Sequence, residues 1–182
     1  EDGRAALMPY LMGGFPDQET ATAVAGAYAD SGADLIELGV PFSDPLADGP
    51  IIHAADTAAL EAGATLESVL ETCATISDRL PVAVMIYANM LLGDAPGSAA
   101  KLAEAGAAGV IVPDLPLEEA QPVREAVNEH GLALIPLVAP TTPDERRRAI
   151  CAAAQGFVYV VSTVGTTGER DDLPPALTDL VK

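Results

Sequence analysis

The chain has 182 residues, 49% of them hydrophobic, and a formal net charge of -18 from 27 acidic and nine basic side chains. This length suits a single domain, expected over residues 1–182. The acidic charge argues against nucleic acid or an anionic membrane as a partner, since both would be repelled. The longest apolar runs fall well short of the roughly 20 residues that span a bilayer, so we expect a soluble, cytoplasmic protein.

Short aliphatic runs recur along the chain, with helical patterns between them. The predicted strands lie at residues 6–12, 34–40, 82–88, 109–115, 132–138 and 157–163. They read as continuous apolar runs without strict alternation, which is typical of parallel strands covered on both faces. The last three start about 24 residues apart, as repeated βα units do.

The helical patterns carry start and stop signals. Residues 116–119 and residues 142–145 each combine a proline with two acids, which predicts the first turn of a helix. In the second of these, Thr142 is the predicted cap and Pro143 the first helical residue. Gly131 is expected just past the end of the intervening helix.

Six βα units fit either a barrel or a doubly wound sheet. No Gly-x-Gly-x-x-Gly follows the first strand, and polar or glycine-rich residues collect after nearly every strand, at one rim. This favours an α/β fold of the (β/α)8 TIM barrel family. A complete barrel takes roughly 250 residues, so about six of the eight units are expected here, with the last two missing at the C-terminus.

The stretch DLIELGVPFSDPLADGP, residues 34–50, runs an apolar strand into an acidic loop. Glu37 lies near the end of this strand, on the same face as Leu35 and Gly39. If that face points into the barrel, burial raises the pKa of the carboxyl group toward the range of a general acid or base. The alternative is a structural carboxylate paired with the backbone or a cation.

Two further acids in the loop admit structural explanations as well. Asp48 is a candidate catalytic carboxylate, but an aspartate near an N-cap, with Pro50 as the first helical residue, would occur without any catalytic need. Asp44, which precedes Pro45, suits an Asx-turn.

Other candidate residues follow later strands. Tyr87 and Tyr159 lie near strand ends, where a phenol either lines a pocket or packs in the core. Residues 162–168, STVGTTG, could cradle a phosphate, form a lid or serve only as a connection. Cys73 and Cys151 are predicted to be buried, with no disulfide and no metal site.

The motifs PYLMGGFPD, GADLIELGVPFSDPLADGP, MIYANM, VIVPDLP and YVVSTVGTTG together resemble the alpha subunit of tryptophan synthase, in order and over essentially the whole chain. The resemblance implies an eight-stranded (β/α) barrel and a carbon–carbon lyase of tryptophan biosynthesis. It would cleave indole-3-glycerol phosphate to indole and glyceraldehyde 3-phosphate. It also implies an alpha2beta2 heterotetramer, with pyridoxal phosphate in the beta subunit and no cofactor in this one.

The resemblance also implies roles for individual residues. Glu37 would be the acid and base of the reaction, and Asp48 would accept the indole N–H. Residues of the substrate pocket and its mobile loop would be Tyr10, Met85, Tyr87, Tyr159, Thr167 and Gly168, and residues facing the beta subunit would be Pro41 and Asp44. The usual N-terminal helix of the family is expected to be missing. Alternatives are a stand-alone lyase and a non-catalytic module that binds and regulates a beta subunit.

Overall fold

The computed structural model describes residues 3–46, 48–162 and 177, in which strands alternate with helices. The strands are β1 (Tyr10–Met12), β2 (Ile36–Gly39), β3 (Val82–Met85), β4 (Gly109–Ile111), β5 (Ala133–Ile135), β6 (Leu137–Val138) and β7 (Tyr159–Val160). The helices are α1 (Gln18–Asp30), α2 (Pro50–Glu61), α3 (Leu66–Ile76), α4 (Asn89–Leu92), α5 (Ala95–Glu104), the 3-10 turn η1 (Leu117–Glu119), α6 (Gln121–Glu129) and α7 (Asp144–Ala153).

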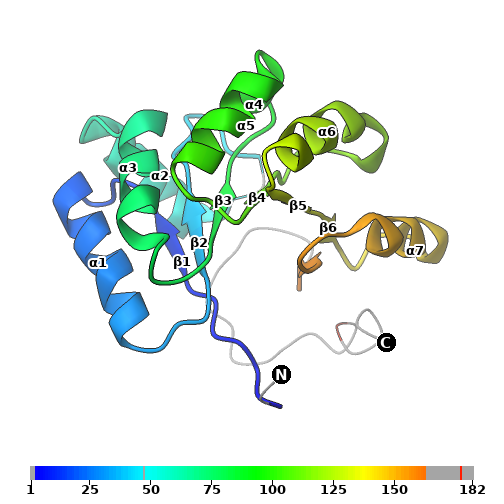
Figure 1. The fold of residues 1–182 in the computed structure, drawn as a ribbon, viewed down its shortest axis with the longest axis horizontal. Coiled ribbons are helices and arrows are strands. Elements are labelled where there is room, and N and C mark those ends of the chain that lie inside the picture. Colours follow the sequence, from blue (N-terminus) through cyan, green and yellow to red (C-terminus); the bar gives the residue numbers. More distant parts are fainter. Residues whose placement is uncertain (1–2, 47, 163–176, 178–182) are drawn as a thin grey trace.

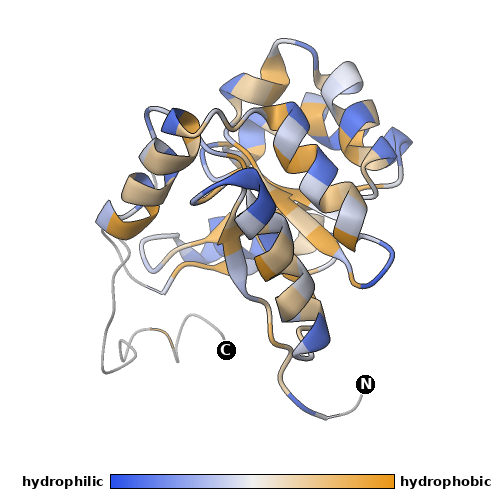
Figure 2. Cartoon of the chain, turned by 90° about the vertical axis from the view of Figure 1, so that its left-hand side faces the viewer, coloured by the Kyte–Doolittle hydropathy of each residue, from blue (hydrophilic) through white to orange (hydrophobic). Residues whose placement is uncertain are grey.

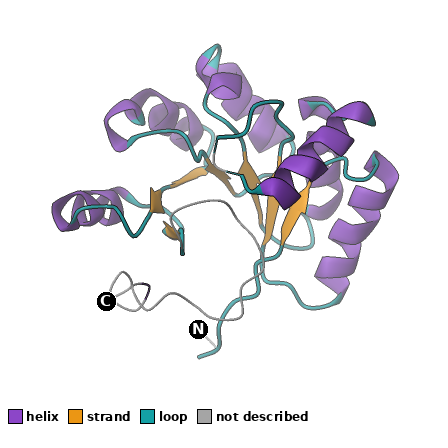
Figure 3. Ribbon diagram, turned by 180° about the vertical axis from the view of Figure 1, so that it is seen from behind, coloured by secondary structure: helices purple, strands orange, loops and turns teal. Residues whose placement is uncertain are grey.

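The strands form a curved row with helices along its convex side (Figure 1, and from behind in Figure 3). Strands β1 to β5 pair in sequence order and all pairs are parallel, and β6 pairs in parallel with β7. This order never reverses, which excludes the doubly wound alternative. The predicted fold class, a (β/α) barrel of which this chain forms part, is confirmed.

Successive strand residues face two different apolar layers. The outward residues of the strands, such as Ile36, Val84 and Val110, pack with helix residues in one large buried cluster. The inward residues Ala83 and Ile111 belong to a smaller cluster on the concave side. Figure 2 shows the strands as a hydrophobic band beneath helices that carry hydrophilic stretches. Both sheet faces are therefore apolar, as the continuous apolar runs predicted.

The predicted strand 132–138 is two strands in the structure. Its first half, β5, pairs with β4, whereas its second half, β6, pairs with β7. Pro136 lies between them, and because proline has no backbone N–H it cannot continue the ladder as a donor. Its carbonyl still accepts from the backbone N–H of Tyr159 at 2.9 Å. The prediction of a single strand over residues 132–138 was wrong.

Two predicted helix starts are displaced. Residues 117–119 form the turn η1, and the α-helix begins only at Gln121. The cap of α7 is Pro143 rather than Thr142. The Thr142 hydroxyl instead accepts a hydrogen bond from the backbone N–H of Ala139 at 2.9 Å, so it closes the preceding turn.

The cysteine prediction is half right. Cys73 is fully buried, but Cys151 is exposed on α7. The neighbouring Ile150 is the buried residue of that helix, and one step along a helix turns the next side chain about 100° away. None of the helices in the described ranges is long and apolar enough to cross a membrane.

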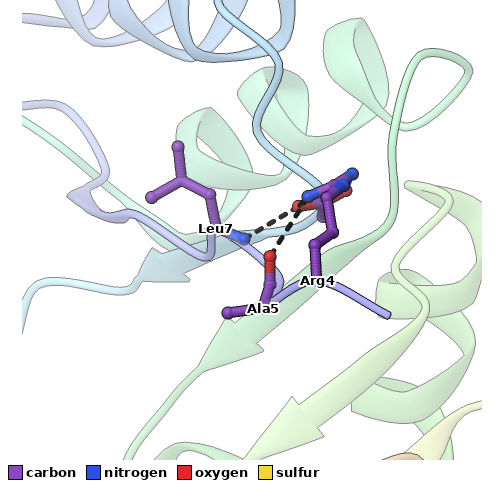
Figure 4. A network of polar contacts seen from close by, with 4 residues as sticks. Arg4, Ala5 and Leu7 are labelled. Carbon is purple, nitrogen blue, oxygen red and sulfur yellow. Dashed lines mark hydrogen bonds and ion pairs between the residues drawn. The ribbon is translucent and has the colours of Figure 1, made fainter. Parts of the chain in front are cut away.

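The segment before β1, with Arg4 and Leu7 (Figure 4), is hydrogen-bonded to Asp34 at the start of β2. The Arg4 guanidinium donates to both oxygens of the Asp34 carboxylate, at 2.7 and 2.5 Å. The backbone N–H of Leu7 donates to Oδ2 at 2.8 Å, and the Asp34 N–H donates back to the Leu7 carbonyl at 2.8 Å. The hydrogen bonds from Arg4, then the one from Leu7, lower the pKa of Asp34 to about 2.

We expect Asp34→Asn to lower the thermal unfolding midpoint at pH 7 by about 2–4 °C, the scale of one lost charged contact in a chain of this size. The folded pKa lies below the ordinary value, so this stabilisation is present at neutral pH and is lost as the pH falls toward 2. The difference in midpoint should therefore shrink in acid. Asp78→Asn, at an exposed aspartate, is the control, and an equal effect from it would contradict the assignment.

Candidate active site

Glu37 lies on the concave face of the curved sheet. It pairs in register with Tyr10 on β1 and Ala83 on β3, and Ala83 belongs to the inner apolar cluster. The side chain is 6% exposed, and burial raises the pKa of its carboxyl group. No salt bridge between described residues includes Glu37. The structural alternative of an ion-paired carboxylate therefore has no support in this part of the chain.

Tyr10 reaches across the neighbouring strand to the end of β2. A Cβ atom at Gly39 would overlap the Tyr10 hydroxyl, so only glycine leaves room for the phenol there. Burial first, and then the negative charges of Asp48 and Asp56, raise the pKa of Tyr10 well above its usual range. The Tyr10 hydroxyl is therefore a neutral group close to both acids.

Asp48 accepts a hydrogen bond from a residue in the loop after β3. The Tyr87 hydroxyl donates to Asp48 Oδ2 at 2.8 Å, and the Tyr87 ring stacks on Phe42 with centroids 4.9 Å apart. The N-cap of α2 is Gly49, with no side-chain capping bond. Asp48 therefore lies next to the N-cap, with Pro50 as the first helical residue as predicted, but its carboxylate accepts from Tyr87 and does not cap the helix.

Tyr159 lies near both carboxylates. Its ring packs against the inner apolar cluster, as does Met85. Burial first, and then the charges of Glu37 and Asp48, raise the pKa of the Tyr159 hydroxyl. Both acids therefore lie within electrostatic reach of one phenol, on the concave side and at the carboxyl ends of the strands.

Two acids that the sequence analysis did not single out also organise this rim. Asp114 Oδ1 accepts from the backbone N–H of Ala88 at 2.8 Å and so ties the loop after β4 to the loop after β3. Asp56, on α2, is 2% exposed, and its Oδ1 accepts from the Phe42 N–H at 3.2 Å. Asp56 lies three residues before the buried Ala59 on the same helix, and this spacing could have indicated that Asp56 is on the buried face.

The remaining predicted residues fall in different places. Pro41 is buried, whereas Asp44 is exposed and accepts a hydrogen bond from the Ser43 hydroxyl at 2.6 Å. Thr167 and Gly168 lie outside the described residues. Within the described ranges, no group of three acidic, histidine or cysteine side chains could hold a metal ion.

A cavity of about 150 Å³ lies elsewhere, between α6 and α7. Its lining comes from the ends of β4 and β5, from η1 and from these two helices, and it includes Arg124 and Arg146. Neither Glu37 nor Asp48 lines it. The paired acids, and not this cavity, therefore mark the candidate active site.

The comparisons with known proteins agree on one family. The family model described as tryptophan synthase alpha chain matches residues 1–182. This chain belongs to the tryptophan synthase alpha chain family. Tryptophan synthase alpha chains from Thermosynechococcus vestitus and Roseiflexus castenholzii are 48% and 51% identical to it over 181 and 175 residues. These alignments cover 98% and 94% of this chain, and 68% and 67% of the two relatives.

Solved structures of tryptophan synthase share the fold closely. The Mycobacterium tuberculosis enzyme matches with a TM-score of 0.91 at 43% identity, covering 98% of this chain and 70% of that one. The a2b2 complex from Pyrococcus furiosus matches with a TM-score of 0.90 at 36% identity, covering 97% and 72%. The family predicted from the motifs is confirmed, and with it a carbon–carbon lyase of tryptophan biosynthesis.

Proposed function

We propose that this chain cleaves indole-3-glycerol phosphate to indole and glyceraldehyde 3-phosphate, with Glu37 and Asp48 as its catalytic residues. The observation that carries the proposal is their unlike surroundings beside one phenol. Glu37 is buried in an apolar wall, whereas Asp48 is partly exposed and accepts a hydrogen bond from Tyr87. Two carboxyl groups in different environments suit two different catalytic roles.

In this mechanism Glu37 moves the protons. Its protonated carboxyl group donates to C3 of the indole ring, which gives an indoleninium ion without a metal or an imine. The carbon–carbon bond then breaks, and its electron pair restores the aromatic ring. The hydroxyl group on the departing carbon becomes an aldehyde, and Glu37 takes up the proton that this hydroxyl loses. The proton balance of the carboxyl group is therefore restored in each turnover.

Asp48 stabilises the charge that this step creates. Protonation at C3 places positive charge on the ring nitrogen, and a carboxylate that accepts its N–H opposes that charge. The hydrogen bond from Tyr87 fixes Asp48 Oδ2, which leaves Oδ1 for the substrate. A carboxylate fixed before the reaction loses little energy to reorganisation during it.

The other predicted pocket residues take supporting roles in the proposal. Tyr10, Met85 and Tyr159 line the ring site on the concave side, where burial keeps water from the reacting carbon. Thr167 and Gly168 would cover the substrate as a mobile loop and contact its phosphate.

The proposed partner is a tryptophan synthase beta subunit that carries pyridoxal phosphate, in a cytoplasmic alpha2beta2 assembly. The acidic loop around Pro41 and Asp44 would face it. Apolar exposure at this rim supports a protein interface, because Leu46 in the acidic loop is 87% exposed and Ile51 in the first turn of α2 is 62% exposed. Leu92, after β3, is 50% exposed as well.

The proposal predicts that the chain forms indole from indole-3-glycerol phosphate and that a beta subunit raises its rate about 10-fold or more, since closure of the loops would depend on the partner. Indole release is measured with and without beta subunit. Where the natural polypeptide extends beyond these residues, the whole of it is used.

The same assay separates the alternatives. Fast turnover that a beta subunit does not change would identify a stand-alone lyase. Activation of the beta subunit without any indole formation would identify a non-catalytic module. Either result would contradict the proposal.

A further inference from the structure

Asp56 is a buried acid with one oxygen unused. On the second turn of α2 it is 2% exposed, and Oδ1 accepts from the Phe42 N–H. Its Oδ2 is buried and has no hydrogen-bond partner among the residues that the structure describes. A single backbone N–H needs only a neutral acceptor, and burying an ionised oxygen without a partner is unfavourable. The hydrogen bond alone therefore does not explain a carboxyl group at this position.

A short series of contacts leads from Asp56 to Asp48. The backbone of Phe42 is held by Asp56 Oδ1 at 3.2 Å, and the Phe42 ring stacks on Tyr87. The Tyr87 hydroxyl in turn donates to Asp48 Oδ2. A change at Asp56 therefore reaches Asp48 through one hydrogen bond, one ring contact and a second hydrogen bond.

The charge of Asp56 also acts directly on the groups around Asp48. The charges of Asp48 and Asp56 both act on the hydroxyl of the half-buried Tyr10, so all three groups lie close together. Burial is the main reason that the pKa of Asp56 rises to about 6, and the charge of Asp48 raises it further. The Phe42 N–H and the charge of His53, one turn away on the exposed side of α2, lower it. Tyr10, Asp48 and His53 are thus the ionisable groups that face Asp56 from β1, the acidic loop and its own helix.

We propose that Asp56 is a positioning residue for the lyase reaction, one that fixes Asp48 through Phe42 and Tyr87 and sets the negative charge behind it. When Oδ2 is protonated, Oδ1 still holds Phe42 and the geometry is kept. When Oδ2 is ionised, a second negative charge stands near Asp48 and stabilises the positive charge that develops on the substrate ring. The inference rests on the proposed function of Glu37 and Asp48.

The test compares wild type with Asp56→Asn, which keeps an oxygen acceptor for Phe42 but cannot ionise. The kcat/KM of wild type for indole formation is divided by that of Asp56→Asn, and this ratio is measured from pH 5 to 8 with beta subunit present. The ratio should be close to 1 at pH 5 and rise to about 3–10 at pH 8, with a midpoint near pH 6. Taking a ratio cancels the titration of Glu37, which both proteins share. A ratio that does not vary with pH would overturn the charge role.

Asp56→Ala tests the positioning role separately, because it also removes the acceptor for Phe42. Its kcat/KM should fall about 10-fold below that of Asp56→Asn at every pH. Equal values for the two variants would overturn this role. Glu61→Gln, at an exposed acid at the end of the same helix, is the matched control and should follow wild type throughout.

A readout without catalysis keeps the inference testable if a variant folds poorly. Carbon-13 labelling of aspartate carboxyl groups in the wild-type protein should show one buried resonance that titrates near pH 6 and is missing from Asp56→Asn. Titration near the ordinary aspartate range would overturn the charge role. If wild type forms no indole, the proposed function fails; if it forms indole but the ratio is flat, only the charge role of Asp56 fails.

Discussion

We expect Glu37→Gln to lower kcat for indole formation by roughly 10³-fold, the range for loss of a general acid and base. The amide has the volume and nearly the shape of the carboxyl group, but it can neither donate to C3 nor accept the hydroxyl proton. Because the chemical step is lost and binding is not, KM should change by less than about 3-fold. Single-turnover measurement of indole release checks both values.

The same substitution should leave the fold intact. Burial raises the folded pKa of Glu37 above its ordinary value, so ionisation of this group is unfavourable in the folded protein. That penalty is absent in acid and grows as the pH rises through the folded pKa. Glutamine never ionises, so the thermal unfolding midpoint of the variant at pH 8 should equal or exceed that of wild type.

Two controls make the result specific. Glu71→Gln changes an exposed acid on α3 and should keep full activity. Activation of the beta subunit by Glu37→Gln should also persist, because Glu37 is buried on the concave face, whereas the loop proposed to face the partner includes the exposed Asp44. Near-normal indole formation by a folded Glu37→Gln protein would rule out the assigned role.

The fold class and strand order could be predicted because they depend on local patterns. Apolar runs, acids in first turns and helix-ending glycines are all readable in a single chain. Strand limits were less predictable, because pairing depends on neighbours. Pro136 interrupts the ladder where the apolar pattern continues unbroken, and only the pairing of β6 with β7 shows the change of partner.

In the candidate site, too, some features could be predicted from local sequence and others could not. Glu37 lies near the end of β2 and Asp48 lies in the loop that follows it, where catalytic residues of barrels collect, and the resemblance of this stretch to the family implied their roles. The requirement for glycine at position 39 was not predictable, because it comes from the Tyr10 ring, which packs against this position from the neighbouring strand β1. Asp56 was missed for a related reason: a helix pattern shows which face an acid occupies, but not that packing excludes water from one of its oxygens.

Asp48→Asn should lower kcat/KM for indole formation by about 10²-fold, the loss typical of one group that stabilises charge in the transition state. Asparagine can still accept from Tyr87 through its side-chain oxygen, so the loop should keep its position. What disappears is the negative charge opposite the ring nitrogen. Steady-state kinetics with beta subunit present measures the loss, and near-normal turnover would contradict the assigned role.

Two comparisons separate the charge of Asp48 from its placement. Tyr87→Phe removes the hydrogen bond at 2.8 Å but leaves the carboxylate, so it should lower kcat/KM only about 3- to 10-fold. A substrate methylated on the ring nitrogen has no N–H to offer, so wild type and Asp48→Asn should differ much less on it than on the natural substrate. If the difference stayed near 10²-fold on the methylated substrate, Asp48 would act at some other atom, because a group that recognises the N–H loses that advantage when the N–H is gone.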